Sequence, residues 1–196
     1  MKRLSIILLP IFLGSCSLLT RVDDDPVRHL LEAEVPSRSE NSSKPVVAVA
    51  RPMIPPYLER PEFVTRTENG TLKIHDNNLW AESLDAGISR VVADNLRRLK
   101  GSTNIQPAAN FITRDYSSLV EIRIERFDPL PDGNLILECT WLVQPIGGGD
   151  AAPKTFRTTV PVVESKVPEI NTGMRGRVVA MNEALARLSR AIAKAL

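Results

Sequence analysis

The sequence LVEIRIERFDPLPDGNLILECTWLVQ, residues 119–144, contains the strongest structural signal in the chain. Apolar and polar residues alternate over 119–127 and again over 135–144, and a Pro-Asp-Gly turn at 131–133 separates the two runs. Because successive side chains of a strand point to opposite faces, this pattern predicts a long antiparallel hairpin with one buried face. Trp141 falls on the apolar face, which makes it a candidate core residue.

Shorter apolar runs on either side of this hairpin predict additional strands. They cover the segments 27–35, 45–51, 62–67, 71–76 and 155–163. Asn69-Gly70 lies between two of these runs, and an Asn-Gly pair in this position is typical of a tight hairpin turn. We therefore expect a second hairpin upstream of the long one.

Two segments have apolar residues at helical spacing. Residues 79–100 and 173–196 each place these residues on one face, which predicts amphipathic helices. Trp80 and Leu84 at the start of the first helix are candidate core residues, and Asp-Asn-Asn at 76–78 offers N-caps. Elements that are apolar on one side must cover one another. The expected fold class is therefore α/β (α+β), a single mixed sheet of about five to six strands with two long helices packed on it.

The N-terminal sequence predicts an export signal. Two basic residues precede an apolar run over 4–13, a pattern typical of a secretory signal peptide and too short to span a bilayer. The run ends in Leu-Gly-Ser-Cys at 13–16, which resembles the lipobox of bacterial lipoproteins. The resemblance implies cleavage before Cys16 and lipidation of that cysteine, while an ordinary signal peptide with an incidental cysteine is the alternative. Ser17 follows, and the lipoprotein sorting rule then favours the periplasmic face of the outer membrane.

The predicted organisation is a signal peptide at 1–15, a lipidated tether at 16–26 and one domain at 27–196. A chain of 196 residues, 43% of them hydrophobic, is long and apolar enough for one folded domain. It has 25 Lys and Arg against 23 Asp and Glu, and two of the basic residues lie in the signal peptide. The mature chain then has no net charge, which argues against a nucleic-acid-binding surface.

Residues suited to catalysis or metal binding are few and isolated. His29 and His75 have no Cys or acid at metal-ligand spacing, and we expect both to be exposed strand residues. Cys139 lies on the apolar face of its strand and is expected to be structural. The glycines at 147–149 and the nearby Lys154 do not match a phosphate-binding loop, because a proline precedes the lysine. The sequence therefore predicts no enzyme, no metal site and no cofactor.

Several segments resemble those of one family of envelope lipoproteins. The most specific are PYLERP at 56–61, followed by FVTR at 63–66, and LWAESL at 79–84. The long hairpin and the C-terminal helix add weaker matches, so the resemblance covers residues 27–196. These segments are similar to the PqiC/YmbA-like lipoproteins, the auxiliary lipoprotein component of ABC-type and MCE-type transport systems. Ser83 departs from the family pattern, which usually has proline at that place.

The resemblance implies a function in the envelope of a Gram-negative bacterium. It predicts an outer-membrane-anchored accessory protein that supports lipid transport between the inner and outer membranes and envelope integrity. The implied partners are an MCE-domain protein and its inner-membrane component, and a homo-oligomer is possible. A structural or assembly lipoprotein unrelated to transport is the alternative, and an anchored enzyme is a third hypothesis that lacks a catalytic residue set.

A segment rich in proline, residues 52–61, is the candidate contact surface for a partner. Four prolines restrict its backbone, and a pre-ordered backbone lowers the entropic cost of binding. Tyr57, Leu58 and Arg60 are the interface candidates, because aromatic residues and arginine are common interface anchors. The structural alternative is that Arg60 holds a carboxylate such as that of Glu82.

Overall fold

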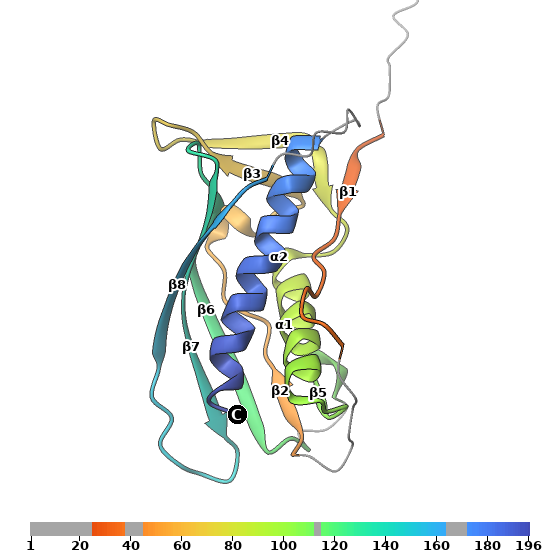
Figure 1. The fold of residues 1–196 in the computed structure, drawn as a ribbon, viewed down its shortest axis with the longest axis vertical. Coiled ribbons are helices and arrows are strands. Elements are labelled where there is room, and N and C mark those ends of the chain that lie inside the picture. Colours follow the sequence, from red (N-terminus) through yellow and green to blue (C-terminus); the bar gives the residue numbers. More distant parts are fainter. Residues whose placement is uncertain (1–24, 38–44, 112–114, 164–171) are drawn as a thin grey trace, which may run out of the picture.

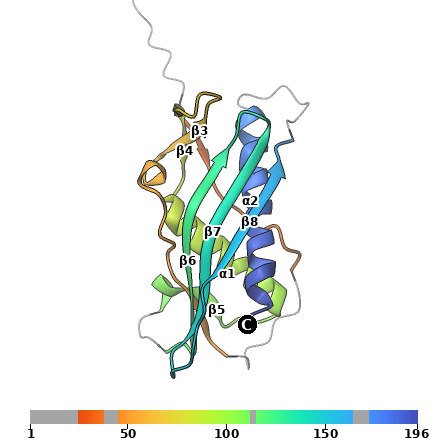
Figure 2. The same cartoon turned by 90° about the vertical axis from the view of Figure 1, so that its left-hand side faces the viewer.

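The computed structural model describes residues 25–37, 45–111, 115–163 and 172–196 (Figures 1 and 2). Cys16, the signal peptide and most of the tether lie outside the described residues. In the described part of the chain, no helix is both long and apolar enough to cross a membrane. The fold is α+β as expected, but the strands form two sheets, so the expectation of a single mixed sheet is wrong.

The larger sheet has five strands and is built around the predicted long hairpin. Its strands, in spatial order, are β5 (Ile105–Pro107), β2 (Val47–Val49), β6 (Ser118–Pro129), β7 (Asn134–Pro145) and β8 (Lys154–Pro161). β2 is parallel to both of its neighbours, whereas the β6–β7 and β7–β8 pairs are antiparallel. The alternation in the sequence is confirmed, because Val120, Ile122 and Ile124 are buried while Glu121 and Arg123 are exposed.

Both helices cover one face of this sheet and pack on each other (Figure 1). They are α1 (Leu84–Lys100) and α2 (Thr172–Ala193). Their apolar faces meet the sheet in one core that includes Ile88, Leu96, Leu185 and Leu188, all fully buried.

Helix α1 begins later than the sequence predicts. Leu79 and Trp80 are the last residues of strand β4 (Leu72–Trp80), and the expected N-caps at 76–78 lie inside that strand. Ser83 is the N-cap residue, with the extended backbone typical of that position. The helical spacing of Trp80 and Leu84 is therefore coincidental, since the strand pairing of β4 overrides it.

The smaller sheet has three strands, in the order β1 (Val27–His29), β4 and β3 (Glu62–Arg66). It lies at one end of the molecule, at the top of Figure 1. The strands β3 and β4 form the predicted second hairpin, and β1 is parallel to β4. Along residues 118–124 both edges of β6 are occupied, so this hairpin does not pair with β6 there. β7 pairs with one edge, and β2 followed by Met53 pairs with the other.

Strand β1 is much shorter than the predicted strand at 27–35. The chain after His29 lies along α1, whose arginines bind its carbonyl groups. Arg90 donates to the carbonyl oxygen of Leu31 at 2.9 Å, and Arg98 donates to those of Ala33 and Val35 at the same distance. These side-chain bonds take the place of a strand ladder.

An aromatic cluster centred on Phe63 connects the small sheet to the core. The ring centroids of Phe63 and Trp80 are 4.9 Å apart, and His29 and His75 approach Phe63 edge-on. Both histidines are half-buried, which corrects the prediction that they are exposed. The Nε2 atom of His75 lies 2.9 Å from the hydroxyl of Thr65, and burial lowers the pKa of this imidazole. Both histidines therefore have packing roles in the small sheet.

Candidate functional site

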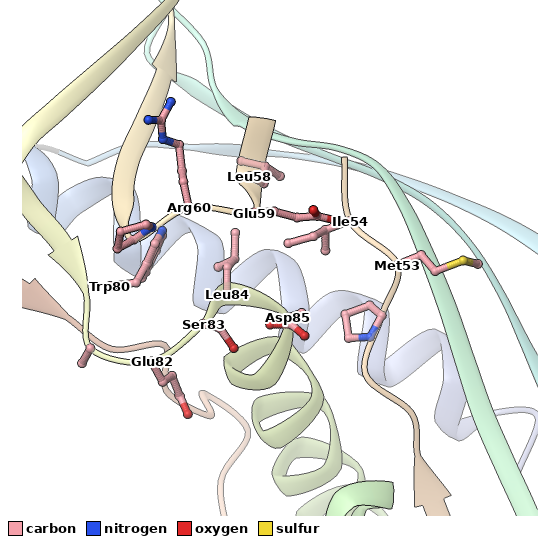
Figure 3. A pocket seen from close by; sticks show the side chains of 13 residues that line it. Met53, Ile54, Leu58, Glu59, Arg60, Trp80, Glu82, Ser83, Leu84 and Asp85 are labelled. Carbon is pink, nitrogen blue, oxygen red and sulfur yellow. The ribbon is translucent and has the colours of Figure 1, made fainter. Parts of the chain in front are cut away.

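A groove of about 890 Å³ lies between the proline-rich segment and the start of α1 (Figure 3). Large apolar side chains line it, among them Ile54, Leu58, Trp80 and Leu84. Four charged residues border it: Glu59, Arg60, Glu82 and Asp85. In Figure 3, Ile54 and Leu84 point toward one another across the groove.

The path of the proline-rich segment creates this groove. Met53 pairs with β6, since its N–H donates to Ile122 at 3.0 Å and its carbonyl accepts from Ile124 at 2.8 Å. The chain then turns through a short 3₁₀ helix, η1 (Pro56–Leu58), and enters β3 in the small sheet. Strand β4 of the same sheet leads into the start of α1. The groove therefore lies between two segments that are far apart in the sequence, residues 52–61 and residues 80–85.

A buried charge cluster fixes η1 in place. Asp128 of β6 is 2% exposed and accepts three hydrogen bonds from the small-sheet side of the molecule. The Tyr57 hydroxyl donates to Oδ1 at 2.6 Å, and Arg66 donates from Nε and Nη2 to Oδ2 at 3.1 and 3.0 Å. Burial, together with the Asp128 carboxylate, raises the pKa of Tyr57 well above its ordinary value. The cluster therefore joins η1, β3 and β6 at one point.

The three interface candidates of the proline-rich segment have different environments. Tyr57 is half-buried in the Asp128 cluster, and Leu58 is 5% exposed, which removes its side chain from the surface predicted for a partner. Arg60 lines the groove, where its Nε atom donates to Glu62 at 2.9 Å and lowers the pKa of that carboxyl. Arg60 therefore holds a carboxylate, as the structural alternative predicts, but this carboxylate is that of Glu62, and Glu82 pairs with Arg90 instead.

The core candidates lie where their hydrophobicity predicts. Trp80, Leu84 and Trp141 are all at most 7% exposed and belong to the main core. Trp80 and Leu84 also line the groove, so the core and the groove share a wall. Met53 and Ile54 also line the groove and were not among the candidates, although an apolar pair between prolines is a signal of exposed apolar surface.

Most of the charges around the groove are paired. Asp85 pairs with Arg51 at 3.3 Å. Burial alone would raise the pKa of Asp85, but hydrogen bonds from Ser83 and Ala86 and the nearby Arg51 hold it below its ordinary value. Among the described residues, no ion-pair partner is found for Glu59, which is exposed. The groove therefore presents one uncompensated carboxylate beside apolar side chains.

The described residues include neither a metal-binding cluster nor an accessible thiol. No group of three or more His, Cys, Asp or Glu side chains in this part of the chain could hold a metal ion. Cys139 is 2% exposed, and burial raises the pKa of its thiol to about 12, which keeps it protonated and unreactive. A groove with an apolar wall and a few charged groups suits recognition of another molecule.

Comparison with protein families gives one match over most of the chain. Residues 29–193 match the family described as the ABC-type transport auxiliary lipoprotein component. No curated protein matches the chain.

Solved structures with the same fold share little sequence with this chain. The crystal structure of an uncharacterised protein has 21% identity and a TM-score of 0.63, and the match covers 81% of this chain and 98% of that one. A protein from Xanthomonas campestris has 14% identity and a TM-score of 0.65, with 85% and 92% covered. A PelC dodecamer from Paraburkholderia phytofirmans is less similar in structure, with 13% identity, a TM-score of 0.41 and 77% and 92% covered.

Proposed function

The chain belongs to the ABC-type transport auxiliary lipoprotein component family, and from this premise we propose that it is the outer-membrane-anchored accessory lipoprotein of an MCE/ABC-type lipid transporter. The observation that carries the proposal is the family match over residues 29–193. The groove supports it, because the proposal needs a surface that binds a partner and the groove offers apolar and charged groups to one. In this function the domain contacts an MCE-domain protein and its inner-membrane component.

Lipidation of Cys16 would confine the domain to one membrane face. Each buried methylene group contributes about 0.8 kcal/mol, so a single acyl chain binds only marginally and several chains anchor a protein stably. Confinement raises the local concentration of the domain near any partner that reaches the same membrane. Weak contacts through the groove are then sufficient for a lasting association. Ser17 favours the outer membrane as the site of this anchor.

Replacement of Cys16 by alanine is expected to abolish lipidation. The variant loses the sulfur that takes up the lipid, so it should incorporate no radiolabelled palmitate and should disappear from the outer-membrane fraction. Cys139→Ala is the matched control, because it removes the other cysteine of the mature chain and should keep both the label and the location. Palmitate incorporation into the Cys16→Ala protein would contradict the assignment.

Thiol titration of the membrane-extracted wild-type protein gives an independent test of the same anchor. In denaturant we expect one reactive thiol, that of Cys139, because the sulfur of Cys16 is alkylated. In the folded protein at pH 8 we expect almost no reaction, since Cys139 is buried and its pKa is raised to about 12. Two reactive thiols in denaturant would show that Cys16 is unmodified.

Affinity purification of the native lipoprotein from chemically crosslinked membranes tests the transport function. We expect an MCE-domain protein and an ABC-type inner-membrane component to co-purify with the wild-type chain and to be depleted with Cys16→Ala. Recovery of envelope proteins without any transporter component would favour the alternative, a structural or assembly lipoprotein. The size of the purified lipoprotein before crosslinking, measured by light scattering, would reveal a homo-oligomer.

A further inference from the structure

We infer that the groove binds an extended segment of the partner protein that carries an apolar side chain next to a lysine or arginine. This inference rests on the proposed function and specifies the chemistry of the partner at one site. Three features of the groove lead to it: an open strand edge, an apolar wall and an unpaired carboxylate.

The open strand edge is formed by residues 52–54. Met53 directs its N–H and carbonyl groups to β6. Backbone groups of neighbouring residues in an extended chain point to opposite edges, so Ile54 directs its own groups away from β6. No hydrogen bond in the described part of the chain uses the N–H or carbonyl of Ile54. An edge with unpaired backbone groups is a template for an additional strand.

The apolar wall provides a place for one side chain of such a strand. Ile54 and Leu84 point toward one another across the groove, and Trp80 and Leu58 also line it (Figure 3). Met53, at the outer edge of the groove, is 65% exposed, so apolar surface extends beyond the groove itself. An apolar side chain between Ile54 and Leu84 would remove this surface from water, which favours binding.

The negative charge of Glu59 favours a lysine or arginine next to the apolar residue of the partner segment. Glu59 lies at the groove beside Ile54 and has no ion-pair partner among the described residues. The other carboxylates of the rim are paired with arginines, so Glu59 is the one that a partner cation can neutralise. The same charge disfavours an anionic lipid headgroup, and for this reason we assign the groove to a protein segment.

The surroundings of the open edge are already ordered. The Asp128 cluster holds η1, and the N–H of Trp80 donates to the carbonyl of Pro61 at 2.7 Å, which joins the far end of the proline-rich segment to β4. A partner segment therefore meets a preformed surface, and little ordering entropy of this chain opposes binding.

Phage display tests the chemistry of the occupant. A library of random seven-residue peptides is selected on the lipidated full chain in phosphatidylcholine nanodiscs, after depletion on empty nanodiscs. We expect enrichment of peptides with an apolar residue adjacent to Lys or Arg. Enrichment of acidic peptides, or no enrichment at all, would overturn the inference.

Variants then locate the binding site of the most enriched peptide. Glu59→Gln removes the exposed ion pair that Glu59 would form with the Lys or Arg of the peptide, so binding should weaken about two- to five-fold. Glu59→Lys should weaken binding further. Glu68→Gln, an exposed carboxyl in the β3–β4 turn, is the matched control and should leave binding unchanged. Equal binding by all variants would place the peptide elsewhere and overturn the inference.

Two competitors test the mode of binding. N-methylation of alternate backbone amides in the peptide should abolish binding, because a strand that joins the edge at Ile54 must donate from its own N–H groups. Vesicles of phosphatidylglycerol should not compete with the peptide. Full binding of the N-methylated peptide would rule out strand addition, and competition by the vesicles would assign the groove to lipid.

The transporter purification separates this inference from the proposed function. If the transporter co-purifies equally with wild type and Glu59→Lys, and both melt at the same temperature, the groove is not the contact while the transport function stands. If no transporter co-purifies with the wild-type chain, the proposed function fails whatever the peptide results are.

Discussion

Replacing Asp128 by alanine is expected to lower the free energy of unfolding by about 3–5 kcal/mol, because it removes three hydrogen bonds to a buried carboxylate, each worth at least about 1 kcal/mol. The substitution leaves the half-buried Tyr57 hydroxyl without its acceptor and leaves Arg66 and Arg126 without the carboxylate that they pair with. Domains of this size are stable by only about 5–15 kcal/mol, so much of the protein should unfold at moderate urea concentrations. Urea denaturation followed by circular dichroism measures the change.

Two control variants test whether the loss of stability is specific to the Asp128 cluster. Tyr57→Phe removes one hydrogen bond and should cost about 1 kcal/mol. Asp132→Ala removes an exposed turn carboxylate that accepts one backbone hydrogen bond, and its effect should be of similar size or smaller. If Asp128→Ala costs no more than these controls, the cluster does not hold the two sheets together.

Replacing Trp80 by alanine is also expected to cost about 3–5 kcal/mol, the range for truncating a large buried aromatic residue. Trp80 is 7% exposed and stacks on Phe63, so its removal leaves a cavity where β4 meets α1. The melting temperature and the soluble yield should both fall, and Trp80→Phe should recover part of the loss.

Trp80 also lines the groove, so the same variant distinguishes a core role from an interface role. A core residue affects stability first, and partner binding fails because the domain unfolds. An unchanged melting temperature with lost co-purification of the transporter would instead assign Trp80 to the contact surface.

The sequence predicts those parts of the fold that depend on local pattern. The β6–β7 hairpin follows from strict alternation and a Pro-Asp-Gly turn, and both helices follow from their apolar faces. The division into two sheets depends on which strand edges are free. That β6 has β7 on one edge and β2 with Met53 on the other is a property of the assembled molecule, which no local pattern contains.

The sequence predicts that the proline-rich segment forms part of the candidate site, but it does not predict the other residues that line the groove or their ion pairs. Its restricted backbone follows from the prolines, and Arg60 does line the groove. The partner of Arg60 could not be deduced, since Glu62 and Glu82 are equally suitable by charge; in the structure Arg60 pairs with Glu62, and Glu82 pairs with Arg90. The opposite wall comes from residues 80–85, about thirty positions away, and sequence alone does not bring these segments together.

The position of β1 in the small sheet determines how far the groove can lie from the membrane. Ten residues lie between Cys16 and Val27, where β1 begins, so eleven steps along the chain connect them, and an extended chain spans at most about 3.6 Å per step. A domain anchored through Cys16 therefore starts within about 40 Å of the bilayer surface, with the small sheet attached to the tether. Trp80, on the groove wall, pairs with His29 at the other end of β1. If the groove is the contact, a partner would have to come within roughly this distance of the anchoring membrane to reach it, so a shortened partner would leave the groove empty even with its binding segment intact.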